Sequence, residues 1–146
     1  MIDRQSGDVI LSQGIRLGAS TTRAEFMASA LGRNAQPFVG NGPYCSYRVE
    51  AELKGGERFL VIPFFHGERM DAVWLVSLEV GYAGDQGFSP ESEQAELDRK
   101  EWHDRWLASV LGASAPVRLA WGSALSVFEP RSMSSQIVIR YREAGQ

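Results

Sequence analysis

The sequence predicts an α+β fold: one domain over residues 1–146, in which a mainly antiparallel sheet of about six strands packs against one short and one long helix. Residues 44–82 contain three consecutive stretches with strand periodicity, separated by turn-forming residues. Helix-capping patterns begin at Thr22 and at Ser89-Pro90. The chain has 146 residues, of which 44% are hydrophobic, and this is enough for one continuous core.

The first predicted elements are a short hairpin and a short helix. Residues 8–17 (DVILSQGIRL) favour a hairpin, which is too small to be stable unless it joins a larger sheet or packs on a helix. Thr22 and Glu25 form a capping box, so a helix begins directly after Thr22. Gly32 is expected to end this helix in the left-handed conformation. The residues at helical spacing that should face the sheet are Phe26, Met27, Ala30 and Leu31.

Three strands form the centre of the predicted sheet. Residues 33–43 hold two prolines and two glycines and predict a connection, with a brief extended piece at Phe38-Val39. Residues 44–53 and 70–80 alternate between apolar and polar positions, so each should bury one face. Residues 58–65 are almost continuously apolar, which is typical of a strand covered on both faces. The residues of the third strand expected together on one side are Ala72, Trp74, Val76, Leu78 and Val80.

The second half of the chain predicts a long helix followed by strands. After a glycine-rich loop at residues 81–88, the helix should cover residues 90–111 and end at Gly112. The stretches that favour strands after it are 116–122, 124–129 and 136–142, the last two as a hairpin, before a frayed tail at 143–146. The inner face of the long helix is expected to carry Ala95, Trp102, Trp106, Ser109, Val110 and Leu111. The two tryptophans suit a core stripe, and the alternative is that one of them anchors a partner.

Two short segments suggest an internal duplication. Met27–Gly32 and Leu107–Gly112 are identical at four of six positions, and each closes a helix that precedes strands. A duplicated helix-then-strands unit would begin its second copy near residue 90. The segment Leu17–Gly32 (LGASTTRAEFMASALG) also resembles the helix of small α+β domains of the BamE and β-lactamase-inhibitor-protein type, in which a short helix packs on an antiparallel sheet. This resemblance implies binding rather than catalysis.

Composition argues against several classes of protein. The formal net charge of −3 argues against a nucleic-acid binder, which normally presents a basic face to phosphates. No run of apolar residues approaches the length of a membrane span, and the first residues (MIDRQSGDVI) do not resemble a secretory signal. We therefore expect a cytoplasmic protein. The single cysteine, Cys45, excludes an internal disulfide.

One pair of residues would support catalysis. If Leu53 pairs with Arg58 across the first turn, simple antiparallel register puts Cys45 opposite His66, as a thiolate and its base. The apolar faces of the flanking strands align with different residues of the middle strand, so a bulge at Pro63 is an alternative that would separate the pair. The catalytic alternative is therefore a small hydrolase or transferase.

Metal ligation is not indicated. The set His66, Glu68 and Asp71 has no recognised ligand spacing, and His103 and Asp104 are adjacent residues that point about 100° apart on a helix. We expect these side chains to be solvated charges, and we predict no metal and no cofactor.

Charge is unevenly distributed along the chain. Residues 84–105 carry seven acids and three bases, a local net charge of −4, so the rest of the chain sums to +1. This pattern fits a solvated helix, and alternatively a surface that steers a basic partner into place. The candidate partner-binding residues are Glu93, Glu96, Asp98, Glu101 and Asp104 on the helix, with Arg131 and Met133 at the tip of the last hairpin.

In size, charge and fold type the protein resembles bacterial immunity proteins, which neutralise toxins in the cytoplasm. The resemblance implies a non-catalytic protein that binds a basic toxin or effector domain and blocks it sterically, with no nucleic-acid or membrane partner. A homodimeric accessory module that pairs through a sheet edge is a further alternative, so both a monomer and a homodimer are left open.

Overall fold

The computed structural model describes residues 1–80 and 90–142, without the side chains of residues 90–92, and it confirms the α+β class and the single domain. The predicted loop at 81–88, the cap at Ser89 and the tail at 143–146 lie outside the described residues. The elements are β1 (Val9–Ile10), β2 (Arg16–Leu17), α1 (Arg23–Ala28), α2 (Ala30–Arg33), β3 (Gln36–Asn41), β4 (Tyr44–Glu52), β5 (Arg58–His66), β6 (Arg69–Ser77), α3 (Pro90–Leu111), β7 (Val117–Leu119), β8 (Gly122–Glu129) and β9 (Ser134–Tyr141).

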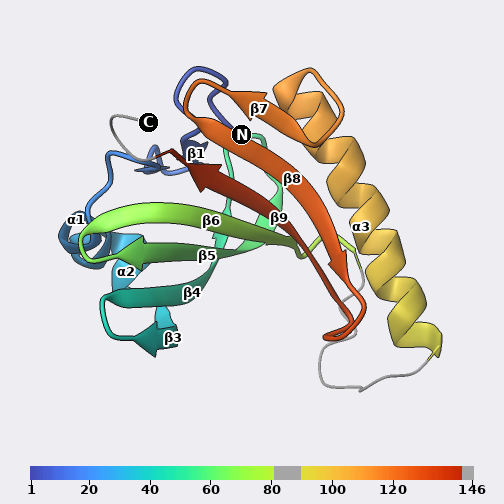
Figure 1. Ribbon diagram of the computed structural model, residues 1–146, viewed down its shortest axis with the longest axis horizontal. Helices are drawn as coiled ribbons and strands as arrows, with labels where there is room; N and C mark the ends of the chain where they lie inside the picture. The colour runs from blue at the N-terminus through green and yellow to red at the C-terminus, as the bar shows by residue number, and fades with distance from the viewer. Residues whose placement is uncertain (81–89, 143–146) are drawn as a thin grey trace.

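Seven strands form one antiparallel sheet in the order β3-β4-β5-β6-β9-β8-β7, and β1 and β2 form a separate two-stranded sheet. The last strand of the chain, β9, therefore joins the β3–β6 meander to the β7–β8 pair. Figure 1 shows the sheet strongly curved, with α1 and α2 at the β4–β6 end and α3 beside β8. None of the described helices is both long and apolar enough to cross a bilayer.

The N-terminal hairpin forms as predicted and docks on the end of β4. Leu11 bridges to Leu53, and the amide of Ser12 donates to the carbonyl of Glu52 at 3.0 Å. The buried Tyr141 hydroxyl of β9 hydrogen bonds with the carbonyls of Gly7 and Leu17. These bonds fix the hairpin against the large sheet, which supplies the packing that so short a hairpin needs.

The short helix begins at the predicted capping box, with Thr22 and Glu25 each accepting from the other's backbone amide. It then breaks at Ser29, whose extended backbone caps α2 in turn. Gly32 therefore lies inside α2 and does not end the helix as expected; a Cβ atom there would approach the carbonyl oxygen of Phe26 to 1.9 Å. Phe26 and Leu31 are buried as predicted, whereas Met27 and Ala30 are exposed, because the break changes the helical phase.

Residues 36–41, expected to be mainly a connection, form β3 at the edge of the sheet. Pro37 and Gly40 are tolerated because an edge strand needs hydrogen-bond partners on one side only, and the register with β4 shifts between these two residues. All six residues of β3 are exposed. The sheet thus has one strand more than the approximate prediction.

The two faces of the sheet differ in what covers them. Buried residues of α1, α2, α3 and the β1–β2 hairpin pack with Val49, Val61 and Leu75 in one hydrophobic core. The alternate residues of the same strands point away from that core, and Ile62 and Val138 are buried there without belonging to it. We call this second side the open face, because many of its side chains remain partly exposed.

The long helix has the predicted bounds, and Gly112 follows it with φ of 75°. Its inner face is shifted from the prediction: Ser109 is exposed, and three polar side chains, those of Glu96, Arg99 and His103, are buried. Trp106 is buried and stacks with the partly buried Trp102, both against Phe59, which confirms the core reading of the tryptophan pair. The last hairpin, β8–β9, also forms as predicted.

Candidate functional site

The open face carries a continuous apolar surface across its central strands. Cross-strand pairing sets Leu60 opposite Val76, Ile62 opposite Trp74, and Phe64 opposite Ala72, and Trp74 in turn lies opposite Val138. Ala72, Trp74 and Val76 were expected to share a side, and they do. That side is the open face, because the intervening Val73 and Leu75 occupy the core. Residues 72–76 are apolar at every position, so period two alone could not decide which set is inside.

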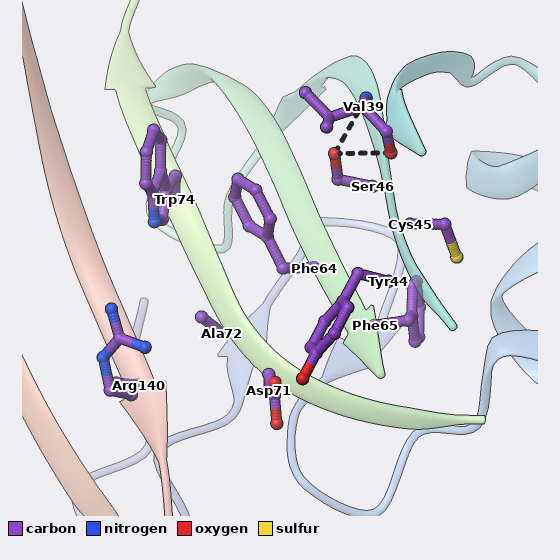
Figure 2. Close-up of a pocket in the computed structure, with 10 residues that line it drawn as sticks. All are labelled: Val39, Tyr44, Cys45, Ser46, Phe64, Phe65, Asp71, Ala72, Trp74 and Arg140. Atoms are coloured by element: carbon purple, nitrogen blue, oxygen red, sulfur yellow. Dashed lines mark hydrogen bonds between the residues drawn. The ribbon is translucent and has the colours of Figure 1, made fainter. Parts of the chain in front are cut away.

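Trp74 is the centre of this surface. Its ring lies 4.7 Å from that of Phe64, centroid to centroid, and its side chain remains partly exposed. Trp74 lines two hollows, one of about 280 Å³ toward Tyr44 and Arg140 and one of about 300 Å³ toward Phe38 and Arg48. Figure 2 shows the first of these hollows, with Trp74, Phe64 and Tyr44 placed along it.

The β3–β4 hairpin adds exposed apolar side chains beside Trp74. Phe38, Val39 and Tyr44 are 43%, 55% and 55% exposed, and they are half of the six large hydrophobic residues exposed in the described chain. The Arg48 guanidinium lies 5.4 Å from the centre of the Phe38 ring, and the Tyr44 ring stacks on His66 at 4.6 Å. Tryptophan, tyrosine and arginine are the residues that contribute most at protein interfaces.

An exposed group of aromatic side chains of this kind is the usual mark of a protein-binding surface. We call the set Phe38, Val39, Tyr44, Phe64 and Trp74 the aromatic patch. In the sequence, the aromatic patch is indicated by the apolar residues at alternate positions of 58–65. That run was interpreted as a strand covered on both faces, whereas Leu60 and Phe64 remain partly exposed on the open face.

The helix edge predicted to bind a partner is less acidic than its sequence suggests. Glu93, Asp98 and Glu101 are exposed and Asp104 is partly exposed. Glu101 pairs with Arg105 at 3.1 Å, and Asp104 pairs with Lys100 at 2.8 Å. We call this set of four acids and two bases the α3 edge; its net charge is −2.

Glu96, the fifth predicted acid, is not on the surface. The residue is 7% exposed. Its carboxylate forms an ion pair with Arg99 and accepts hydrogen bonds from the amide and the hydroxyl of Ser135, at 3.1 Å each. Arg99 is fully buried and donates at 3.0 Å to the carbonyls of Ser77 and Val80. Glu96 is therefore not the exposed acid that was expected: it joins α3 to β9, and its pairing with Arg99 compensates the burial of its charge.

His103 completes this buried polar cluster. It is fully buried, and its Nε2 accepts from the amide of Ser77 at 3.0 Å, while its Nδ1 has no hydrogen-bond partner within the described part of the chain. Burial lowers the pKa of His103 from 6.5 to about 3, with the nearby Arg99 charge contributing. The imidazole is therefore neutral at physiological pH and is not a solvated charge, contrary to expectation.

The structure overturns the catalytic alternative. Glu52 pairs with Arg58, one residue from the assumed register, so Cys45 lies opposite Phe65 and His66 lies opposite Tyr44. Neighbouring strand residues point to opposite faces, and Cys45 packs against the core while His66 stacks on Tyr44. The register shift lies on the β6 side, between Phe64 and Phe65, and not at Pro63.

The other candidate ligand and partner-binding residues have structural roles or lie at the surface. Glu68 accepts from the amide of Ala24 at 2.9 Å and so caps α1, and Asp71 pairs with Arg69 at 2.6 Å. Among residues 1–80 and 90–142, no three potential ligands gather as a metal site. At the β8–β9 turn Arg131 is exposed, and Met133 is partly buried with φ of 50°.

Comparison with known proteins finds a similar fold in a solved structure. No protein-family model matches the chain, and no curated protein sequence is significantly similar to it. The fold is similar to that of a chain in the solved structure "Rhs1-CT in complex with cognate immunity protein RhsI1", with a TM-score of 0.62 and 18% identity over 97% of this chain and 86% of that chain. At this identity the likeness establishes a shared fold.

Proposed function

We propose that this protein is a non-catalytic immunity protein that binds a cognate bacterial toxin or effector domain and blocks its action sterically. The observation that carries the proposal is the aromatic patch, because a surface with Trp74 at its centre and the exposed Tyr44 beside it suits a protein partner. The fold shared with a chain of a complex between Rhs1-CT and its cognate immunity protein supports the same conclusion.

In this proposal the open face makes the central contact. Trp74 and Phe64 would bury their exposed edges against the partner, and Phe38 and Tyr44 on the β3–β4 hairpin would close around it. Steric exclusion of substrate needs no reacting group from this chain. The complex would form in the cytoplasm.

The α3 edge has a secondary part in the proposal. Glu93, Asp98, Glu101 and Asp104 would attract a basic region of the toxin and raise the rate of association, and Arg131 and Met133 would contact its periphery. Two of the four acids already form ion pairs within the helix. The negative electrostatic potential of the α3 edge is therefore weaker than the number of acids in the sequence suggests.

Affinity capture followed by a rescue assay tests the proposal. The tagged protein is incubated with lysate of producing cells, washed at low and then high salt, and the bound proteins are identified by mass. The captured protein is then expressed with and without its binder. One stoichiometric partner that is toxic alone and harmless when co-expressed would support the proposal; no partner, or one whose toxicity is unchanged, would contradict it.

Self-association is the second candidate, since β3 is an exposed edge strand that can pair with another copy. Light scattering at several concentrations measures it directly. A stable homodimer together with failure of the capture experiment would favour the accessory module over the immunity protein.

A further inference from the structure

Three arginines gather on the open face at the end opposite the β3–β4 hairpin. Arg118 of β7 lies opposite Ser123 of β8, and Ser123 lies opposite Arg140 of β9, so the two arginines stand in one cross-strand row with a small side chain between them. Arg142 follows Arg140 by two residues, and alternation along a strand directs it to the same side. Together they line a hollow of about 330 Å³, which we call the arginine hollow.

No carboxylate of the described residues lines this hollow; Asp71, which lines the neighbouring hollow together with Arg140, pairs with Arg69. Arg118, Arg140 and Arg142 are all exposed with no ion pair or side-chain hydrogen bond to any residue among 1–80 and 90–142. Two other exposed arginines are neutralised by carboxylates instead: Arg16 contacts Asp3 and Asp8, and Arg105 contacts Glu101. Three like charges with no counter-ion among residues 1–80 and 90–142 favour the binding of an anionic group.

The arginine hollow is continuous with the aromatic patch. Arg140 lines both the hollow beside Trp74 and the arginine hollow, and its cross-strand neighbour Ala72 separates it from Phe64. Figure 2 shows Ala72 between Arg140 and Tyr44, and Phe64 between Trp74 and Tyr44. A partner seated on Trp74 therefore has to meet Arg140.

We infer that the arginine hollow receives the carboxylates of an acidic segment of the partner protein, next to the apolar side chains that this partner places on Trp74. This rests on the proposed function and specifies the chemistry of the bound partner. Arginine binds carboxylates through paired donors, and Arg118 and Arg140 are two strands apart, so each can bind a different acidic side chain of the segment.

A protein carboxylate fits this site better than a nucleic-acid phosphate. A second hollow, lined by Lys100 and Asp104 of the α3 edge, shares Pro116 and Leu125 with the arginine hollow. A long polyanion that left the arginine hollow on that side would meet the acids of α3. The net charge of −3 also opposes a polyanion over a longer path.

An NMR titration tests the inference without the natural partner. The isotope-labelled protein is titrated with a short all-glutamate peptide and, separately, with a single-stranded oligothymidylate of matched charge. We expect saturable shifts of the arginine Nε–H signals of Arg118, Arg140 and Arg142 with the peptide. Arg140→Glu should weaken this binding at least about tenfold, whereas Arg33→Glu, an exposed arginine of α2 with the same charge change, should leave it within about twofold.

Three outcomes would overturn the inference: no shift of these arginine signals, equal weakening by the Arg33 variant, or tighter binding of the oligothymidylate than of the peptide at the same arginines. The last outcome would assign the site to phosphate. The result is independent of affinity capture: peptide binding without any toxin partner would contradict only the immunity function, and a captured toxin without peptide binding would contradict only the arginine site.

Discussion

The α3 edge and the open face are the two surfaces on which a partner could dock, and they differ in how their charges are used. On α3 the charges largely satisfy one another: Glu96 pairs with Arg99 inside the protein, and Lys100 and Arg105 pair with acids one turn away. On the open face, Arg118 and Arg140 come from strands separated in the chain and have no acidic partner in the described residues.

The difference shows that local charge counted along a sequence is a poor measure of charge offered to a partner. A helix brings acids and bases three and four residues apart into contact, so its charges cancel locally. A sheet brings together residues that are distant in the chain, and these reinforce one another where they share a face. The aromatic patch lies on the same face as these unpaired arginines, and this makes the open face the stronger candidate interface.

The largest expected effect tests whether the buried α3 charges are structural. Arg99→Ala leaves Glu96 buried without its partner and should lower the free energy of unfolding by about 3–5 kcal/mol. Arg105→Ala on the same helix removes an exposed pair and should change it by less than about 1 kcal/mol. Urea denaturation measures both. Equal effects of the two variants would show that the buried cluster does not stabilise the helix on the sheet.

The next effect concerns binding at the open face. Trp74→Ala removes the central side chain of the aromatic patch and should weaken binding to the captured partner by about thirtyfold or more, or about 2 kcal/mol. Leu97→Ala removes an exposed apolar side chain of α3 and should change the affinity by less than about threefold. Isothermal titration calorimetry gives both values. A larger loss of affinity in the Leu97 variant than in the Trp74 variant would indicate that the interface lies on α3.

Acidification should loosen α3 before it affects the open face. In the unfolded chain His103 has its ordinary pKa of 6.5, whereas the folded protein lowers it to about 3. The unfolded state therefore binds more protons as pH falls below 6.5, and stability is full above that pH and declines toward pH 3. Between pH 7.5 and 5 we expect a loss of about 2 kcal/mol in the free energy of unfolding. His103→Gln should show a smaller pH dependence, and an unchanged one would contradict this role of His103.

The smallest expected effect is that of the exposed acids of α3. Glu93→Lys with Asp98→Lys should weaken partner binding by about threefold to tenfold, mostly through the association rate, and less at high salt. The neutral pair Glu93→Gln with Asp98→Asn should give about half this change in free energy. Stopped-flow or surface binding kinetics measures the rates. An effect on the dissociation rate as large as that of Trp74→Ala would place these acids in direct contact with the partner.

Much of the fold followed from local patterns, and the site did not. The capping box at Thr22, the meander and the bounds of the long helix depend on neighbouring residues, so sequence periodicity was sufficient. The β4–β5 register differs by one residue from the one assumed, because Glu52 and not Leu53 pairs with Arg58. A shift of one residue is enough to place Cys45 and His66 on opposite faces of the sheet. The α3 inner face was misassigned because Glu96 and Arg99 compensate each other when buried.

The arginine hollow could not be inferred from the sequence, because Arg118 and Arg140 meet only through β8, which lies between their strands. Placing them required the strand order and both registers. The aromatic patch could be predicted in part. The apolar residues at alternate positions of 58–65 and 70–80 indicate a second apolar face of the sheet. The pattern does not show whether other elements of the protein cover that face.

Side-chain footprinting by hydroxyl radicals, on the free protein and on its complex with the captured partner, tests the open-face interface most directly. Oxidation of Trp74, Phe64 and Tyr44 should fall strongly in the complex, while that of Leu97 on α3 stays unchanged. Protection of Leu97 with undiminished oxidation of Trp74 would contradict the account and place the partner on the long helix.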